Sequence, residues 1–394
     1  MPKHEKLFLI SYAIYLVHQI LSYSFYSVKI SGTLSRLVLV LCLFLFLVND
    51  FRFGKLYKNK LISYLSVVFM SCICIYLNYP NLAFMLLVIF YGRNVDFKDI
   101  CRVTAIVTVI GLLFVFTSAK MGIITEYIGY RGDGTKRSYL GFRYALFAPG
   151  FLINLLSCYI YLKSGKLGKI KLIACLLFSY YIYSLTDARL SFVLAVAMII
   201  LTPIISEGQK NNSNVKKRII SKALIPIYPV LTLISVLCSL YYRSNSIIWQ
   251  TIDRILTRRL QYSQRSLLLY GVKLFGNSNI KWAGFSISAD GTLPVYDSSM
   301  IYVDNAYIHL LQRYGVIFTA LIAISFTYTM YILYKKNDYL MQFLFVIVAI
   351  HALIDNQVLY LCFNAFLFPM YNEIVSYTKK AYIQENSAIT EIMS

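Results

Sequence analysis

Residues 100–119, ICRVTAIVTVIGLLFVFTSA, decide the fold class of this chain, because Arg102 carries the only charge among them. A helix of about 20 apolar residues crosses the hydrocarbon core of a bilayer. Apolar stretches of this kind recur along the 394 residues, of which 59% are hydrophobic and only 14% are charged. So few charges cannot cover the surface of a soluble protein, so we expect an all-α, polytopic membrane protein.

The apolar stretches predict about twelve membrane-spanning helices, within a range of ten to twelve. We expect them to form a single integral membrane domain over residues 1–394. They lie near residues 7–28, 34–49, 61–79, 81–92, 100–119, 145–162, 171–186, 190–206, 223–241, 314–334, 339–354 and 357–371. The fourth stretch is too short to cross as a straight helix, and short segments can be broken or re-entrant where they line a cavity.

The basic residues predict the orientation of the chain. With both termini in the cytoplasm, the clusters in residues 52–60, 163–171, 210–222 and 335–336 fall in inner connections, as the positive-inside rule requires. A net charge of +21 would suggest nucleic acid in a soluble protein. Here the charges separate apolar segments, so they point first to topology and then to anionic lipid or phosphate. We therefore expect no nucleic-acid partner.

Two segments that this orientation places outside the membrane are nevertheless basic. They are residues 120–143 and the long extracytoplasmic loop 242–304. Their basic residues are Lys120, Arg131, Lys136, Arg137 and Arg143 in the first, and Arg243, Arg254, Arg258, Arg259, Arg265, Lys273 and Lys281 in the second. Long loops escape the positive-inside rule. The charge of these two segments therefore calls for a function.

Within the long loop, residues 252–269 are predicted to form one amphipathic helix. At 100° per residue Arg254, Arg258 and Arg265 fall within about 60° of one another, and Arg259 falls outside this stripe. A guanidinium binds phosphate through two parallel hydrogen bonds. The stripe therefore suggests a diphosphate site, and the alternative is a face in contact with solvent or anionic headgroups.

Two expected outer turns carry carboxylates. Asp187 lies in the short turn 186–189 together with Arg189, where the alternative to a functional role is a local ion pair between the two. Asp304 precedes a helix that we expect to begin at Asn305. The positive end of that helix and the arginine stripe should keep the Asp304 carboxylate ionised.

His309 lies in the same expected helix. It shares a helical face with Asn305 and Arg313. Two roles are open for this imidazole, that of an acid or base and that of a hydrogen-bonding residue at a helix interface.

Four short motifs, taken in order, resemble the O-antigen polymerase and ligase superfamily, whose enzymes transfer glycans between polyprenyl diphosphate carriers or onto lipid A. The motifs are Arg137-Ser-Tyr-Leu-Gly141-Phe142, Thr186-Asp187-Ala188-Arg189, Arg265-Ser-Leu-Leu-Leu269 with Gly276 downstream, and Asp304-Asn305 followed by Gly315. They cover roughly residues 120–320. At the last motif the ligases of this superfamily carry His-Asn or His-Ser. This chain has Asp304 in place of the histidine, and the resemblance is therefore greater to the polymerase branch.

The resemblance implies a metal-independent glycosyltransferase without a cofactor, in the bacterial cytoplasmic (inner) membrane. It would act in the biosynthesis of O-antigen, the polymer of lipopolysaccharide, or of another surface polysaccharide. Donor and acceptor would be oligosaccharides on undecaprenyl diphosphate, and a chain-length regulator and a flippase would be its partners. The implied diphosphate-binding residues are Arg265, Arg258 and Arg189, supported by Arg137 and Arg254. The candidate catalytic bases are Asp304 first, then Asp187 and His309.

Two other functions stay open. A flippase for lipid-linked oligosaccharides should show two similar halves and short outer loops, and the long loop 242–304 argues against it. An O-antigen ligase shares the architecture and would need a lipopolysaccharide core as its acceptor.

The orientation can be tested by cysteine labelling in intact cells. We expect a membrane-impermeant thiol reagent to label a cysteine placed at Ser288 in the outer loop and to spare one at Ser213 in an inner connection. The opposite pattern would reverse the orientation and move the proposed site to the cytoplasm.

Overall fold

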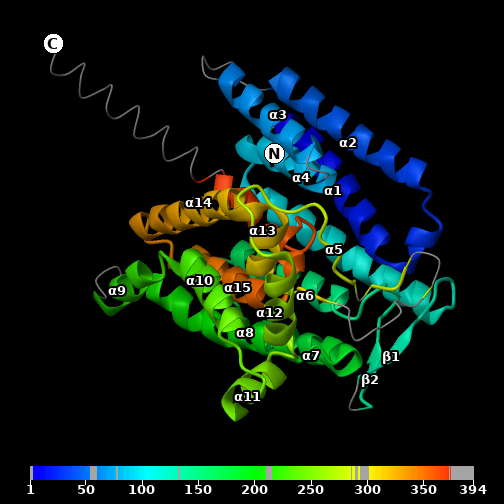
Figure 1. The fold of residues 1–394 in the computed structure, drawn as a ribbon. Helices are drawn as coiled ribbons and strands as arrows, with labels where there is room; N and C mark the ends of the chain where they lie inside the picture. Colours follow the sequence, from blue (N-terminus) through cyan, green and yellow to red (C-terminus); the bar gives the residue numbers. More distant parts are fainter. Residues whose placement is uncertain are drawn as a thin grey trace.

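A computed structural model describes residues 3–53, 60–76, 79–131, 134–209, 215–284, 286–288, 292, 301–371 and 373 (Figure 1). The described chain is mostly helical. Its elements are α1 (Lys3–Tyr23), η1 (Phe25–Val28), α2 (Gly32–Phe53), α3 (Lys60–Tyr76), α4 (Pro80–Tyr91), η2 (Gly92–Asn94), α5 (Phe97–Lys120), β1 (Ile128–Tyr130), β2 (Lys136–Ser138), α6 (Phe147–Leu162), α7 (Lys169–Thr186), α8 (Arg189–Gln209), α9 (Val215–Ala223), α10 (Ile227–Leu240), α11 (Ile247–Ile255), α12 (Arg259–Tyr270), α13 (Ala306–Arg313), α14 (Gly315–Lys335), α15 (Tyr339–Ile354) and η3 (Asn356–Leu359).

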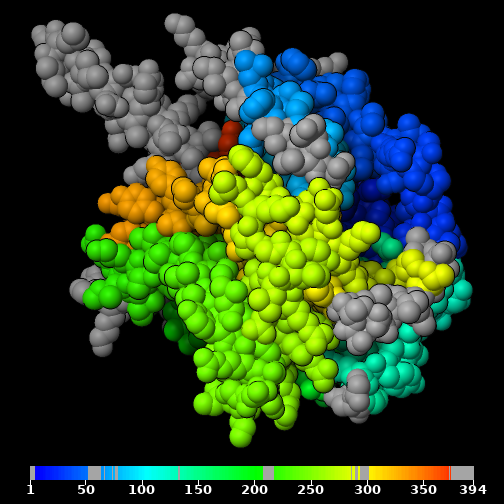
Figure 2. All heavy atoms as spheres, viewed as in Figure 1, coloured from blue at the N-terminus to red at the C-terminus, as the bar shows by residue number. Residues whose placement is uncertain are grey.

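The helices pack around α15, most of whose residues are buried. Helix α15 contacts α6, α8, α10 and α14, and α1 packs against α2 and α5. In Figure 1 the helices α1 to α4 lie along one side of the bundle, and α7 to α10 lie on the other. The yellow-green segment of α12 and the loop after it covers the centre of the face shown in Figure 2.

Large apolar side chains remain exposed on the outer faces of several helices. Exposed examples are Phe44 on α2, Ile110 and Leu113 on α5, Val193 on α8, Leu233 on α10 and Ile324 on α14. A soluble monomer rarely exposes such large apolar patches, whereas lipid tails cover them without cost. The described helices therefore support a polytopic membrane protein.

Buried serine and threonine hydroxyls bond to the backbone of their own helices. Thr104 donates to the carbonyl of Ile100 at 2.8 Å, and Thr202 donates to that of Met198 at 2.7 Å. A hydroxyl that donates to the carbonyl one turn back along its own helix has its hydrogen bond satisfied without water. These polar residues are therefore compatible with helices in a bilayer.

The prediction of about twelve spans, within a range of ten to twelve, is wrong for the described residues. Five helices are long and apolar enough to cross a membrane, namely α2, α5, α7, α8 and α14, and α9 with α10 forms a sixth candidate, bent by 53°. Helix α4 has 12 residues, and α6 and α15 have 16 each. At 1.5 Å per residue, such helices fall short of a core about 30 Å thick.

The expected last span, residues 357–371, starts within η3, continues through turns to residue 366 and becomes helical only at residues 367–371. Asn154 of α6 compensates for the broken helix. Its amide donates to the carbonyl of Cys362 at 3.0 Å and accepts from the N–H of Ala365 at 3.0 Å. Irregular backbone inside a membrane protein is tolerated where protein groups satisfy it in this way.

The prediction of a single amphipathic helix over residues 252–269 is also wrong. The structure breaks it into α11 and α12, and Thr257 and Arg258 in the break have left-handed backbone conformations. The buried carboxylate of Asp253 accepts from the N–H groups of Leu260 and Gln261 at 2.9 and 3.3 Å. Asp253 thereby caps α12 and fixes the break, because the first N–H groups of a helix need partners outside it.

Two backbone segments cross at close range at the start of α14, and each has a glycine of the sequence motifs at the crossing. Gly276 and Gly315 both have positive φ, of 83° and 91°. A Cβ at Gly276 would lie 2.8 Å from the carbonyl carbon of Tyr314, and one at Gly315 would lie 2.7 Å from that of Phe275. The crossing lets Val316 donate to the carbonyl of Lys273 at 3.1 Å, so it fastens the long loop to α14.

We expect Gly315→Ala and Gly276→Ala each to lower the stability of the protein. The left-handed conformation costs about 1–2 kcal/mol for a residue with a Cβ, and the overlap adds about 1–3 kcal/mol. Thermal unfolding in detergent measures the effect. Gly168→Ala is the matched control, since its Cβ would meet nothing within 4 Å and its φ is −66°. Equal melting temperatures for all three variants would contradict the crossing.

Candidate functional site

Two cavities meet at one end of the bundle. The large cavity has a volume of about 1140 Å³ and the small cavity about 480 Å³, and both are lined by Tyr144, Asp304 and Asp355. Lining residues come from the end of α1 and from the chain before α4, before α6, between α7 and α8, after α10 and after α15. All of these are outer connections in the predicted alternation of the segments, so the structure gathers them at a common end.

The large cavity is strongly cationic. Its lining arginines are Arg131, Arg137, Arg189, Arg254, Arg258 and Arg259, and its carboxylates are Asp253, Asp304 and Asp355. Its tyrosines are Tyr127, Tyr130, Tyr139, Tyr144, Tyr242, Tyr262 and Tyr302. With six arginines against three carboxylates, the cavity has an excess of positive charge. Guanidiniums beside aromatic rings suit a ligand that carries phosphate groups and sugar rings.

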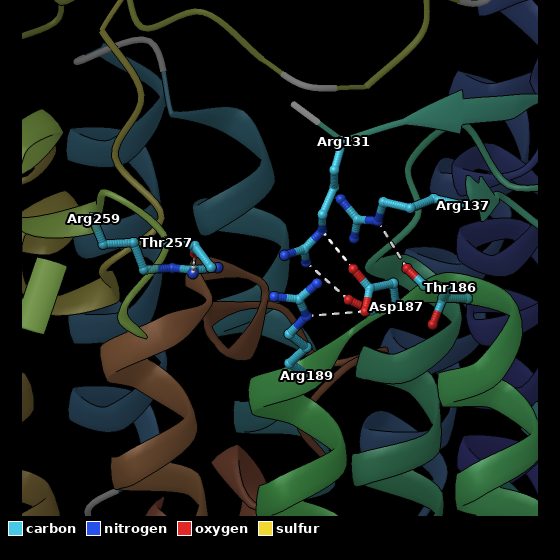
Figure 3. A network of polar contacts seen from close by, with 7 residues as sticks. All are labelled: Arg131, Arg137, Thr186, Asp187, Arg189, Thr257 and Arg259. Atoms are coloured by element: carbon cyan, nitrogen blue, oxygen red, sulfur yellow. Dashed lines mark hydrogen bonds and ion pairs between the residues drawn. The ribbon is translucent and has the colours of Figure 1, made fainter. Parts of the chain in front are cut away.

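Asp187 organises one wall of the large cavity (Figure 3). Its carboxylate pairs with Arg131 Nε at 2.8 Å and with Arg189 Nε at 3.1 Å. Arg131 also donates to the carbonyl of Asp187, and Arg137 donates to that of Thr186, each at 2.8 Å. The local Asp187–Arg189 pair considered from the sequence is therefore present, extended by Arg131.

The network sits on the C-terminus of α7. Asp187 is the C-cap in a left-handed conformation, with φ of 48°, and only 7% of its surface is exposed. The last carbonyls of a helix carry partial negative charge and attract cations. Asp187 therefore acts here as an anchor for Arg131 and Arg189, and its role as a base stays a prediction.

The break between α11 and α12 determines which arginines of the long loop reach the cavity. Arg254, Arg258 and Arg259 line the large cavity, whereas Arg265 is exposed on α12 and lines neither cavity. Arg259, outside the predicted stripe, is the arginine paired with Asp304, at 3.4 Å. The role given to Arg265 stays a prediction.

Asp304 lies between the two cavities, directly before α13. Asn305 caps this helix by accepting from the N–H groups of Tyr307 and Ile308 at 3.0 and 3.3 Å. Burial raises the pKa of Asp304, and the nearby Arg259 guanidinium partly offsets this. The expectation that the helix dipole and the arginine stripe hold Asp304 ionised is therefore opposed by burial, and its cationic partner comes from outside the stripe.

The small cavity is aromatic, and its lining holds one arginine against two carboxylates. Its rings are Tyr23, Tyr79, Tyr144, Phe147, Trp282, Tyr314 and Tyr360. Asn356 and Gln357 of η3 line it together with Arg313, which donates to the carbonyl of Ile280 at 2.9 Å. Aromatic faces beside carboxamides and carboxylates bind sugars, which offer apolar ring faces and hydroxyl groups.

His309 is a hydrogen-bonding residue at the wall of the small cavity. Its Nδ1 lies 3.2 Å from the amide nitrogen of Asn356, and its ring centroid lies 4.6 Å from that of Trp282. Burial, followed by the charge of Arg313, lowers the pKa of His309 to about 3. A neutral imidazole in this place fits the interfacial role left open by the sequence.

Sequence reasoning missed Arg131, Arg259 and Asp355. Arg131 lies 10 residues before Gly141, one fewer than the 11 that separate Arg265 from Gly276 in the third motif. Arg259 lay outside the stripe of a helix that the structure breaks. Asp355 had a signal, because an acidic residue between two apolar segments resembles the case of Asp187. Applying the same criterion to residues 355–357 would have identified it.

Among the described residues, no group of three or more His, Cys, Asp or Glu side chains could hold a metal ion. Comparison with known proteins gives no matching family model, no matching curated protein and no matching solved structure.

The anchoring role of Asp187 predicts a loss of stability in Asp187→Asn. Removing its charge leaves Arg131 and Arg189 without their carboxylate, at a cost of about 1–3 kcal/mol. Thermal unfolding in detergent measures this loss. The control is Asp99→Asn, which breaks a pair with Arg102 on the surface of α5 and should cost less than about 1 kcal/mol. A melting temperature unchanged by Asp187→Asn would rule out the anchor.

Proposed function

We propose that the chain is a polysaccharide polymerase of the bacterial inner membrane, which transfers a growing glycan from undecaprenyl diphosphate to a lipid-linked repeat unit. The observation that carries the proposal is the meeting of an arginine-rich cavity with an aromatic cavity at Asp304 and Asp355. A transfer between two lipid-linked sugars needs two such sites side by side, with a proton acceptor where they join.

In this proposal the large cavity binds the donor. Its arginines hold the diphosphate and stabilise the negative charge that develops on it as the glycosidic bond breaks. Its tyrosines contact the sugars nearest to the diphosphate. The lipid tail lies along the exposed apolar faces of the helices. Arginine suits this task without a metal, because its charge is permanent and its planar group forms two parallel bonds to phosphate.

The resemblance of the motifs to the O-antigen polymerase and ligase superfamily supports the same proposal. Three motif segments contribute to the large cavity, through Arg137, Arg189 and Asp304. The glycine pair of the last two motifs fastens the loop that carries Arg259. The aspartate at residue 304, where ligases carry histidine, favours polymerisation over ligation.

Deletion of the gene, followed by gel analysis of the surface glycans, tests the function. We expect the deletion strain to make single repeat units in place of long chains, and the intact gene to restore the chains. Loss of all surface glycan would indicate a flippase instead. Polymer that accumulates on its lipid carrier would indicate a ligase.

The deletion strain also tests the donor site. We expect Arg259→Ala to reduce chain extension by roughly 10²-fold or more, as the loss of a buried donor to a developing anion does. Arg259→Lys should rescue poorly, since an ammonium cannot form the paired bonds. Arg265→Ala, at an exposed position outside the cavity, is the comparison. A larger defect in Arg265→Ala would show that the large cavity is not the donor site.

A further inference from the structure

Asp355 is a buried carboxylate that has one oxygen without a hydrogen-bond partner in the described part of the chain. It follows α15 directly, lines both cavities and is only 4% exposed. One carboxylate oxygen, Oδ1, accepts from the N–H of Gln357 at 2.9 Å. The other, Oδ2, is buried and has no hydrogen-bond partner in the described part of the chain. A buried carboxylate oxygen without a partner is costly, so the site invites a hydrogen-bond donor.

Gln357 presents a second unused acceptor nearby. This residue is 5% exposed and lines the small cavity. Its side-chain Oε1 is buried and has no partner among the described residues. Asn356, between the two, is already bound to the carbonyl of Val303 at 3.1 Å and to His309. Asp355 and Gln357 therefore offer two free acceptors, while Asn356 holds the turn in place.

The large cavity, which Asp355 also lines, contributes unused donors. Its buried groups without partners in the described residues include two donors, Nη2 of Arg137 and Nε of Arg259. Unused donors require a ligand rich in acceptors, such as a diphosphate, and unused acceptors require a ligand rich in O–H groups, such as a sugar. The two cavities are therefore complementary to two different parts of the reaction.

We propose that Asp355 and Gln357 form the acceptor-sugar subsite, and that Asp355 takes the proton of the attacking hydroxyl. This inference rests on the proposed polymerase function. The aromatic rings of the small cavity would contact the sugar faces, and Gln357 would accept a hydrogen bond from a neighbouring hydroxyl. Asp304 is then a positioning residue, which holds Arg259 in the wall between the cavities.

The transfer step balances on these groups. The acceptor O–H bond breaks and its proton passes to the Asp355 carboxylate. The acceptor oxygen forms a bond to the anomeric carbon of the donor glycan. The bond between that carbon and the diphosphate oxygen breaks, and its electron pair leaves with undecaprenyl diphosphate, whose charge the arginines stabilise. The proton on Asp355 returns to water before the next cycle.

The electrostatics of the turn support this role. Burial and the neighbouring charge of Asp304 raise the pKa of Asp355 to about 8, against the opposing effects of the Gln357 N–H and Arg259. Tyr144 faces the same pair of carboxylates, and burial raises its pKa well above the ordinary value, so it stays neutral. His309, held by Asn356, is neutral as well. A carboxylate with a pKa close to the working pH is an effective proton acceptor.

The proposed role of Asp355 as a base determines how the rate of chain extension changes with pH. A base must be ionised to act, so chain extension should rise with pH and reach half of its plateau near pH 8. Asp304→Asn removes a negative neighbour and leaves Arg259 to act on Asp355 alone, and both effects lower the pKa of Asp355. We therefore expect Asp304→Asn to retain partial activity and to shift the midpoint to lower pH.

The decisive experiment compares variants in two assays. In the first, membranes of the deletion strain carrying each variant extend their own lipid-linked repeat units over a range of pH. In the second, each purified full-length variant in detergent binds inorganic pyrophosphate, as a probe of the large cavity. We expect Asp355→Asn to lose chain extension by roughly 10²-fold or more, as expected for the loss of a catalytic base, and to bind pyrophosphate as the wild type does. Arg259→Ala should lose pyrophosphate binding, and Asp99→Asn should match the wild type in both assays.

Each result bears on the inference. Chain extension by Asp355→Asn at the wild-type rate, or an unshifted pH midpoint in Asp304→Asn, would overturn it. Should Asp355→Asn fail to accumulate, Asp355→Glu decides the matter: partial activity with an altered pH midpoint supports the role, and an unaltered profile contradicts it. A deletion strain that still makes long chains would overturn the polymerase function itself, whatever the variants do.

Discussion

The contact between the Asp187 carboxylate and the side chains of Arg131 and Arg189 makes the cationic cavity possible. Charges that are taken out of water are expensive unless they are paired, and fully paired charges cannot bind a ligand. The turn after α7 resolves this conflict by using backbone carbonyls as well as the carboxylate. Arg137 is held through the carbonyl of Thr186 by a single nitrogen, and its Nη2 remains without a partner among the described residues. The wall thus keeps a net positive charge, with three arginines held by one carboxylate and by backbone carbonyls.

The opposite wall is built by helix caps and by a close backbone crossing. Asp253 caps α12 and forces the break that places Arg258 and Arg259 at the cavity. The crossing of Gly276 and Gly315 then fastens the remainder of the long loop to α14. Neither device depends on lipid, since both satisfy backbone groups with other protein groups. A loop held in this way can position charges as rigidly as a helix does, which a site for group transfer needs.

The described helices support the membrane class that hydropathy predicted, since long apolar stretches need only local composition to be recognised. It overestimated the number of full-length spans, because a buried short helix such as α15 is as apolar as a lipid-facing one. Part of the candidate site could be predicted because charged residues are easily recognised at turns between apolar segments. Arg189 and Asp304 stood out at turns between apolar segments, and both line the cavities. Arg259 was left out of the predicted diphosphate site because one helix was assumed to run through residues 252–269. The buried carboxylate of Asp253 breaks that helix by bonding to the N–H of Leu260. The periodicity of the sequence does not reveal a tertiary contact of this kind.

The place of Asp304 between the cavities links the two halves of the proposed reaction. Arg259 lowers the pKa of both Asp304 and Asp355, so it tunes the proton acceptor as well as the anion site. As the glycosidic bond of the donor breaks, negative charge builds on the diphosphate beside Arg259 and offsets this influence. The affinity of Asp355 for a proton must then rise at the moment when the acceptor hydroxyl has to lose one. Under the proposed function, departure of the leaving group and deprotonation of the acceptor would therefore assist each other across one arginine.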